Sequence, residues 1–186
     1  MGAARDRLLS AAAHRFYRDG VHATGIDTLT AEAQVAKKSL YNNFSSKAEL
    51  VSAYIEARHA EWLALYRARA AQAHTAQERA LAVFDAYLDH AHPTAGGAFR
   101  GCGLLNVAAE FPAGSPERAA VRAHKEEVEQ LLADAVADLA GPDRAAGLAE
   151  HLSFLLEGAV ARAGLEASPD RLEHARALAA GLLARP

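Results

Sequence analysis

Residues 24–50 read TGIDTLTAEAQVAKKSLYNNFSSKAEL, a pattern that predicts two short helices joined by a tight turn. The apolar side chains suit two helices crossed over one small core: Ile26, Leu29, Ala33, Val35, Leu40 and Phe44. The polar side chains between them are left facing outward. This is the build of a helix-turn-helix motif, in which the second helix contacts the major groove of DNA.

The ends of the two helices can also be predicted from the sequence. Thr24 and Asp27 stand in a T-x-x-D relation, in which the threonine oxygen caps the first turn, so a helix should begin near Ile26. It should stop by Ala33 or Gln34. A second helix near Lys37 then leaves about three residues for the turn, as this motif requires.

Two further helices flank the motif. An apolar stripe at helical spacing precedes it and ends at Gly20: Leu8, Ala12 and Phe16. Ser46 and Glu49 form an S-x-x-E capping box, which predicts a longer helix from Lys47. Three short helices therefore precede a long one.

Residues 5–50 resemble the DNA-binding domain of the tetracycline repressor (TetR) family of regulators. The matching residues are Arg7-Leu8-Leu9, Ala11-Ala12, Phe16, Gly20, Thr24, Ile26, Leu29, Ala33, Val35, Lys37, Ser39-Leu40-Tyr41, Phe44, Ser46-Lys47 and Leu50. Two positions depart from the family pattern: Gln34 replaces the usual turn glycine, and Ala36 replaces a Ser or Thr cap. A positive φ at Gln34 would carry modest strain; the alternative is a turn of a different shape. Ala36 lacks a capping oxygen worth roughly 0.5–2 kcal/mol.

The resemblance and the residue types together predict a DNA-contacting set: Thr24, Lys37, Lys38, Ser39, Tyr41, Asn42 and Lys47. The resemblance implies that the Tyr41 hydroxyl reaches a phosphate, whereas Asn42 and Ser39 suit base edges. A phosphate at the start of the fourth helix would offset the unfavourable position of Lys47 near the positive helix end. The alternatives are a solvated pair for Lys37 and Lys38, and a half-buried packing role for Tyr41.

The charge distribution agrees with a DNA-binding head. Residues 1–50 hold seven basic and five acidic side chains, and the remaining residues hold thirteen basic and eighteen acidic ones, within a total net charge of −3. An acidic body would repel the phosphate backbone from the wrong face, and DNA affinity should fall with added salt. At 186 residues, the chain is long enough for a DNA-binding domain at 1–46 and an effector-binding and dimerisation domain at 47–186.

Composition also indicates the cellular compartment and the fold class. One cysteine, Cys102, excludes an internal disulfide framework, and neither a secretory signal nor an apolar run long enough to span a bilayer is present. We therefore expect a soluble, cytoplasmic protein with no membrane contact. Alanine is abundant and no stretch alternates with period two, so the fold should be all-α with about nine helices.

The body's helices are marked by caps and prolines. The fourth helix should run to about Ala73, and Thr75 with Glu78 forms a capping box for a fifth that ends around His90. A short helix is predicted over 102–110. Serine-proline or glycine-proline pairs then predict helices near 116–139, 142–163 and 169–184.

The last two helices predict an assembly. One apolar face of the first consists of Leu148, Leu152, Leu155 and Ala159, and one face of the second consists of Leu172, Ala175, Ala179 and Leu182. These faces could pack within the chain. The resemblance implies instead a four-helix bundle across a two-fold axis, which makes a homodimer whose recognition helices meet half-sites roughly 34–36 Å apart.

The body should also hold a small, apolar effector. The candidate pocket residues are Phe84, Tyr87, Leu88, Phe99, Cys102, Leu105, Asn106, His124, His151, Phe154 and Leu155. Cys102, Asn106 and Glu110 are spaced to share one helix face. Asn106 and Glu110 bonded to backbone would give the same pattern, and for Glu110 this structural interpretation is favoured.

The same residues also allow an enzyme or a metal-binding protein to be considered. An enzyme with Cys102 as nucleophile and His124 as base lacks an oxyanion-donor motif, so we predict no catalytic site and no cofactor. Zinc at His90 and His92 with Cys102 or His124 is a weak signal, and we predict no metal. The sequence thus predicts a repressor released from palindromic double-stranded operator DNA by an effector; alternatives are a Cys102 thiol sensor of oxidants or electrophiles and a helical interaction protein without DNA.

Overall fold

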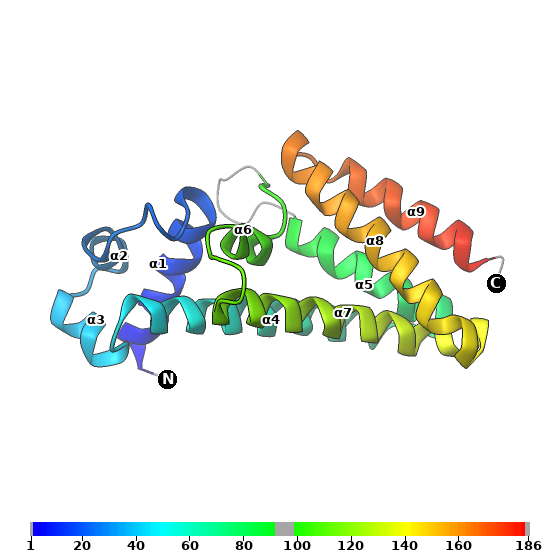
Figure 1. Ribbon diagram of the computed structural model, residues 1–186, viewed down its shortest axis with the longest axis horizontal. Coiled ribbons are helices and arrows are strands. Elements are labelled where there is room, and N and C mark those ends of the chain that lie inside the picture. Colours follow the sequence, from blue (N-terminus) through cyan, green and yellow to red (C-terminus); the bar gives the residue numbers. More distant parts are fainter. Residues whose placement is uncertain (1, 92–98, 185–186) are drawn as a thin grey trace. The chain divides into compact units, whose positions relative to one another are not determined.

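The computed structural model describes residues 2–91 and 99–184, and every regular element in these ranges is an α-helix. The helices are α1 (Ala3–Asp19), α2 (Ile26–Ala33), α3 (Lys37–Asn43), α4 (Lys47–Ala70), α5 (Ala76–Ala91), α6 (Gly103–Ala109), α7 (Pro116–Ala140), α8 (Pro142–Glu166) and α9 (Asp170–Leu183). Figure 1 shows them in chain order. The all-α prediction is confirmed. The helices α2, α3, α4, α5, α7, α8 and α9 each begin within one residue of the start predicted from the sequence.

The chain divides into two compact units. The first comprises residues 1–60 and 103–121, and the second comprises 61–102 and 122–186. This division differs from the predicted boundary at residue 46, because the first part of α4, the whole of α6 and the start of α7 belong to the same unit as the N-terminal helices. The head therefore includes a segment that lies far away in the sequence.

The first unit is built around the crossed helices α1, α2 and α3. Leu8, Phe16, Leu29 and Leu40 are almost completely buried, as the apolar spacing predicted. The ring of Phe16 meets that of Tyr54 from α4 edge-on, with centroids 5.5 Å apart. On the surface, Arg15 of α1 binds Glu32 of α2, which ties the two helices together.

The second unit has a continuous apolar core. Its large buried members come from α4, α5, α7, α8 and α9: Trp62, Phe84, Tyr87, Leu132, Leu152, Leu156 and Leu172. The capping box that opens α5 is reciprocal, since the Glu78 amide binds the Thr75 hydroxyl at 3.1 Å and the Thr75 amide binds the Glu78 carboxylate at 3.0 Å. Helices α8 and α9 pack side by side after a short connection (Figure 1).

The apolar faces predicted for dimerisation are largely used inside the chain. Leu152, Ala159, Leu172, Ala175 and Ala179 are buried in the core of the second unit, and Leu148 and Leu155 pack against it. Of the predicted residues, only Leu182 is exposed. The intrachain packing alternative therefore holds for these faces, because α8 and α9 need them to close their own core.

A different face of α8 remains apolar and exposed. Phe154 is 66% exposed and Leu165 is 83% exposed, and between them Gly158 and Ala161 complete a stripe at helical spacing. On α9, Leu178 and Leu182 are also exposed. These residues, Phe154, Gly158, Ala161, Leu165, Leu178 and Leu182, are called the outer face below.

Candidate functional site

Of the two alternatives for the turn between α2 and α3, the structure has the positive φ at Gln34. Gln34 adopts the left-handed conformation, with φ 52° and ψ 47°, and Val35 donates to the Thr30 carbonyl at 3.0 Å. A non-glycine residue in this region carries strain of about 1 kcal/mol. Ala36 caps α3 without a side-chain hydrogen bond. Packing of the buried Leu40 and Phe44 therefore has to hold α3 in place.

Helix α3 buries one side and presents a polar surface on the other. Lys37, Lys38, Tyr41 and Asn42 are exposed, and Ser39 is half-buried. The Asn43 side chain donates to the Ser39 carbonyl at 2.8 Å, which secures the last turn. Tyr41 is 48% exposed, so its ring is available to a partner rather than packed in the core. The structure thus brings five of the seven predicted DNA-contacting residues together on one short helix.

Lys37 has a partner within the motif. Its ammonium binds Asp27 Oδ1 at 2.9 Å, and this hydrogen bond raises the pKa of Lys37. Both side chains are well exposed, so water and salt weaken the pair. A phosphate group could therefore replace Asp27 at little cost.

Lys47 is less exposed than Lys37 and binds a backbone carbonyl. Its ammonium donates to the Val21 carbonyl at 2.7 Å, and partial burial lowers the pKa of Lys47 despite the nearby charge of Glu110. The capping box before it is only half formed: the Glu49 amide binds the Ser46 hydroxyl, whereas the Glu49 carboxylate turns to the amide and hydroxyl of Ser45. Lys47 therefore lies at the start of α4 as predicted, but bound to the loop before α2.

Thr24 is placed differently from the prediction. Its side chain is buried, with 1% exposure, and its hydroxyl donates to the Gly20 carbonyl at 2.6 Å. Gly25 is the N-cap of α2, with no side-chain cap. Thr24 thus stabilises the loop after α1 and does not belong to the exposed surface, because its one donor is used within the chain.

The predicted effector residues fall into three groups. Phe84, Tyr87 and His124 are buried in the second unit, and Leu88, Phe99, Cys102 and Leu155 are partly buried against the same core. Leu105 and Asn106 belong to α6 of the first unit, and Leu105 is exposed. His151 and Phe154 are exposed on α8, so the structure does not support them as lining of an enclosed pocket.

The proposed helix face of Cys102, Asn106 and Glu110 is not formed. Helix α6 begins at Gly103 and ends at Ala109, so Cys102 and Glu110 lie just outside its two ends. The Glu110 carboxylate accepts hydrogen bonds from the backbone amides of Val21 and His22, each at 2.7 Å. The structural interpretation of Glu110 is confirmed.

The second unit contains a partly buried polar cluster that was not predicted from the sequence. Lys125 of α7 donates to the Tyr87 hydroxyl at 2.9 Å and to Glu157 Oε1 at 2.7 Å. Burial opposes the ammonium, but its interactions with Tyr87 and Glu157 outweigh this effect and raise the pKa of Lys125 overall. Burial also raises the pKa of Tyr87. Spacing could not reveal this cluster, because its members come from three separate helices.

Aromatic rings adjoin this cluster. Trp62 stacks on Tyr66 with centroids 5.8 Å apart, and it contacts Tyr87 and His124 at 5.3 and 5.5 Å. Among the described residues, the buried indole N–H of Trp62 has no hydrogen-bond partner. A buried donor without a partner is rare in proteins and marks a place where an acceptor atom would be favourable.

The cluster should contribute to stability. Replacing Glu157 with glutamine is expected to lower the free energy of unfolding by about 1–3 kcal/mol, because a mostly buried ammonium loses its counter-ion. Urea unfolding measures the loss. The control is Glu126→Gln, whose exposed pair with Arg122 should be worth less than about 0.5 kcal/mol. Equal losses in both variants would contradict the assignment.

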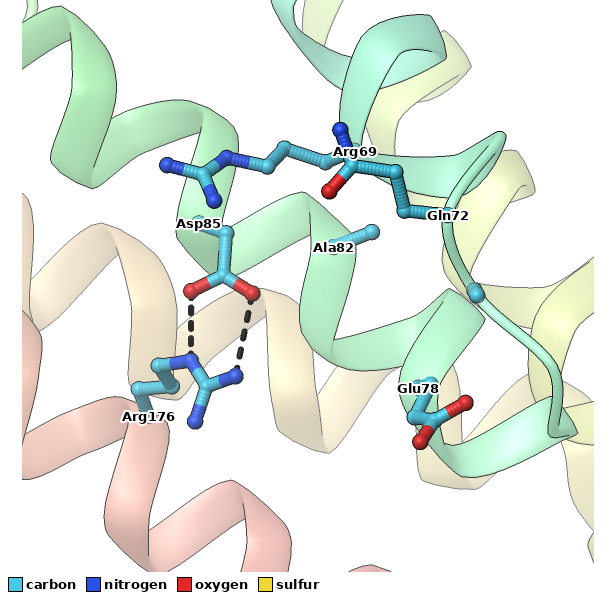
Figure 2. Close-up of a pocket in the computed structure, with 7 residues that line it drawn as sticks. Arg69, Gln72, Glu78, Ala82, Asp85 and Arg176 are labelled. Atoms are coloured by element: carbon cyan, nitrogen blue, oxygen red, sulfur yellow. Dashed lines mark hydrogen bonds and ion pairs between the residues drawn. The ribbon is translucent and has the colours of Figure 1, made fainter.

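A small pocket elsewhere in the second unit is charged. It has a volume of about 150 Å³ and is lined by Arg69, Gln72, Ala73, Glu78, Ala82, Asp85 and Arg176. Figure 2 shows Asp85 of α5 facing the guanidinium of Arg176 from α9, which binds it at 2.5 and 3.0 Å. The pocket is smaller than the roughly 300–1,000 Å³ of ordinary ligand sites. Its size and charge do not suit an apolar effector.

The described residues show neither a metal site nor a membrane-spanning helix. Within residues 2–91 and 99–184, no three His, Cys, Asp or Glu side chains gather as a metal site would require. His92, one member of the weighed zinc site, lies outside the described residues. None of the described helices has the length and apolar character needed to cross a bilayer.

Comparison with known proteins identifies the fold. Residues 8–54 match the model of the bacterial regulatory proteins of the tetR family. The chain is 33% identical to SCO4454, a TetR-family transcriptional regulator from Streptomyces coelicolor, with a TM-score of 0.88, and the match covers 98% of this chain and 95% of that one. A TetR transcriptional regulator from Chloroflexus aurantiacus is 26% identical, with a TM-score of 0.81 over 98% of this chain and 94% of its own. No curated protein matches.

These similarities extend over both units. The identity to the Streptomyces coelicolor regulator covers nearly the whole chain, so the body shares the relationship as well as the head. The exposed basic surface of α3 lies within the matched residues. The proteins that resemble this chain are transcriptional regulators, not enzymes. The chain belongs to the TetR family of DNA-binding transcriptional regulators.

Proposed function

We propose that the protein is a repressor that binds a palindromic operator as a homodimer and leaves it when a small apolar effector binds. In this proposal, the DNA-binding domain at residues 1–46 contacts DNA together with Lys47 at the start of α4, and the domain at residues 47–186 binds the effector and forms the dimer. The observation that carries the proposal is the surface of α3, where Lys37, Lys38, Tyr41 and Asn42 are exposed together beside half-buried Ser39.

The chemistry of α3 supports contact with the major groove. The two lysines supply charge for phosphates, the Tyr41 hydroxyl can donate to a phosphate, and the Asn42 amide can pair with adenine. The residues of α3 that pack into the core are different from those that it exposes. DNA binding would therefore require no rearrangement of the core.

The outer face supports the homodimer. It combines large apolar side chains, Phe154 and Leu165, with Gly158 and Ala161, which allow a second helix to approach closely. Water-exposed phenylalanine and leucine at this spacing are unusual in a monomer. If two protomers packed through α8 and α9 about a two-fold axis, the outer face of one would be covered by the outer face of the other. The same symmetry would pair the two recognition helices.

The aromatic cluster supports an effector site in the body. Trp62, Tyr87 and His124 offer flat apolar surfaces, and the indole N–H of Trp62 offers a buried donor. The protein would be in equilibrium between a DNA-bound state and a released state. An effector would shift this equilibrium towards release only if it bound the released state more tightly than the DNA-bound state. Cys102 is partly buried against the same core.

Selection of bound duplexes from a random pool tests DNA recognition. The wild-type dimer should enrich a palindrome, and Asn42→Ala should relax base preference by roughly 1–3 kcal/mol at one position per half-site. Tyr41→Phe, which removes only a hydroxyl, should weaken binding to all sequences about equally. Failure of the wild-type protein to enrich any sequence would refute the proposal.

A further inference from the structure

One peptide group in the first unit is held from both sides. The peptide between Val21 and His22 presents its carbonyl to the Lys47 ammonium, at 2.7 Å, and its N–H to the Glu110 carboxylate, also at 2.7 Å. The second carboxylate oxygen accepts the Val21 N–H at 2.7 Å. Lys47 and Glu110 are thus linked through the 21–22 peptide, which we call the peptide clamp.

Such a chain of hydrogen bonds is cooperative. A carboxylate that accepts the N–H of a peptide makes the carbonyl of the same peptide a better acceptor, and an ammonium on that carbonyl strengthens the N–H as a donor. The two charged groups therefore support each other without touching. Loss of the Glu110 charge should weaken the hold of Val21 on Lys47.

The loop before the clamp is shaped to admit the carboxylate. Gly20 has φ +92°, and a Cβ atom at this position would lie 3.0 Å from Glu110 Oε1. The His22 ring also binds the Glu110 carbonyl at 2.8 Å and packs on Phe111. Several independent contacts thus place the end of α6 against the loop.

The other end of α6 is packed as closely. A Cβ atom on Gly103 would lie 3.2 Å from the Tyr17 ring and 3.3 Å from the Tyr54 hydroxyl oxygen. Helix α6 is therefore fixed to the DNA-binding unit at both ends. Glu110 is part of that unit, although it lies about sixty residues beyond the helix-turn-helix in the sequence.

We infer that Glu110 is a positioning residue for DNA binding, which holds Lys47 through the 21–22 peptide in the place where it meets a phosphate. The inference rests on the proposed contact of Lys47 with DNA. In the clamp only one hydrogen of the ammonium is committed to Val21, and the other two remain for a phosphate oxygen at the start of α4. Glu110 itself touches no DNA.

The test compares the salt dependence of DNA binding in four full-length proteins: wild type, Glu110→Gln, Lys47→Met and the double variant. The probe is a labelled mixed-sequence duplex a few turns long. Lys47→Met should reduce the slope of log K against log salt by about 1 per protomer. Glu110→Gln should reduce it similarly and weaken binding about tenfold at low salt, and the double variant should show no further loss.

Two further variants separate positioning from general destabilisation. Glu110→Asp keeps the charge and should restore part of the slope, whereas Glu56→Gln removes a charge from an exposed position of the same unit and should leave the slope unchanged. The inference is overturned if Glu110→Gln lowers stability or affinity without changing the slope, if its effect adds fully to that of Lys47→Met, or if Lys47→Met leaves the slope unchanged. A wild-type protein without any salt-dependent binding would instead refute the proposed function.

Discussion

Replacing Gly164 with alanine is expected to lower the free energy of unfolding by about 3 kcal/mol, among the largest effects of any single methyl group in this chain. A Cβ atom on Gly164 would lie 2.5 Å from the Gly101 nitrogen and 2.7 Å from the Arg100 carbonyl carbon. These neighbours are backbone atoms and cannot rotate away as a side chain could. The segment 100–101 would have to move away from its packing position against α8.

The same substitution at Gly147 is the matched control. Gly147 lies in the same helix, is exposed, and has no atom within 4 Å of an added Cβ. Alanine there should stabilise the helix by roughly 0.5–1 kcal/mol, because glycine is the poorer helix former. Urea unfolding at one fixed protein concentration measures both variants. Equal stability of Gly164→Ala and the wild type would show that the close approach of the two backbones is not required.

The second large effect is expected at the outer face. Phe154→Asp should convert the proposed dimer to a monomer and weaken operator binding by roughly 10²–10⁴-fold, because one recognition helix loses the advantage of being linked to a second. A charge in the centre of an apolar interface has no partner and is strongly unfavourable. Phe154 is 66% exposed in the chain, so its replacement should leave the fold of the monomer intact.

Sedimentation and operator titration together measure this prediction. Ala123→Asp places the same charge at an exposed position of α7 and should alter neither assembly nor binding. Leu165→Asp, further along the same stripe of α8, should act like Phe154→Asp. A Phe154→Asp protein that remains dimeric would place the interface elsewhere and remove α8 from the proposed assembly.

The proposed dimer face shows what helical periodicity can and cannot predict. Periodicity locates apolar stripes on α8, but this helix has more than one, and the pattern does not say which stripe packs inside the chain. Leu152 and Ala159 proved to be core residues, whereas Phe154 and Leu165 are exposed. The choice depends on where α5 and α9 lie, which is a property of the packed unit.

The sequence by itself determined the local structure. The helix starts at Ile26, Lys37 and Lys47 and the outward-facing residues of α3 all follow from interactions between residues close together in the chain. Capping, propensity and side-chain direction act over one or two helical turns. Such features can be predicted because their physical causes lie within the same short segment.

Only the tertiary structure decided which distant residues meet. Three contacts join segments that lie far apart in the sequence: the cluster of Lys125 with Tyr87 and Glu157, the close approach of Gly164 to segment 100–101, and the hydrogen bonds of Glu110 to the loop after α1. A carboxylate finds its partner through the packing of whole helices, and packing depends on the shapes of all their side chains together. For that reason Glu110 could be assigned a structural role from its sequence, but not a partner.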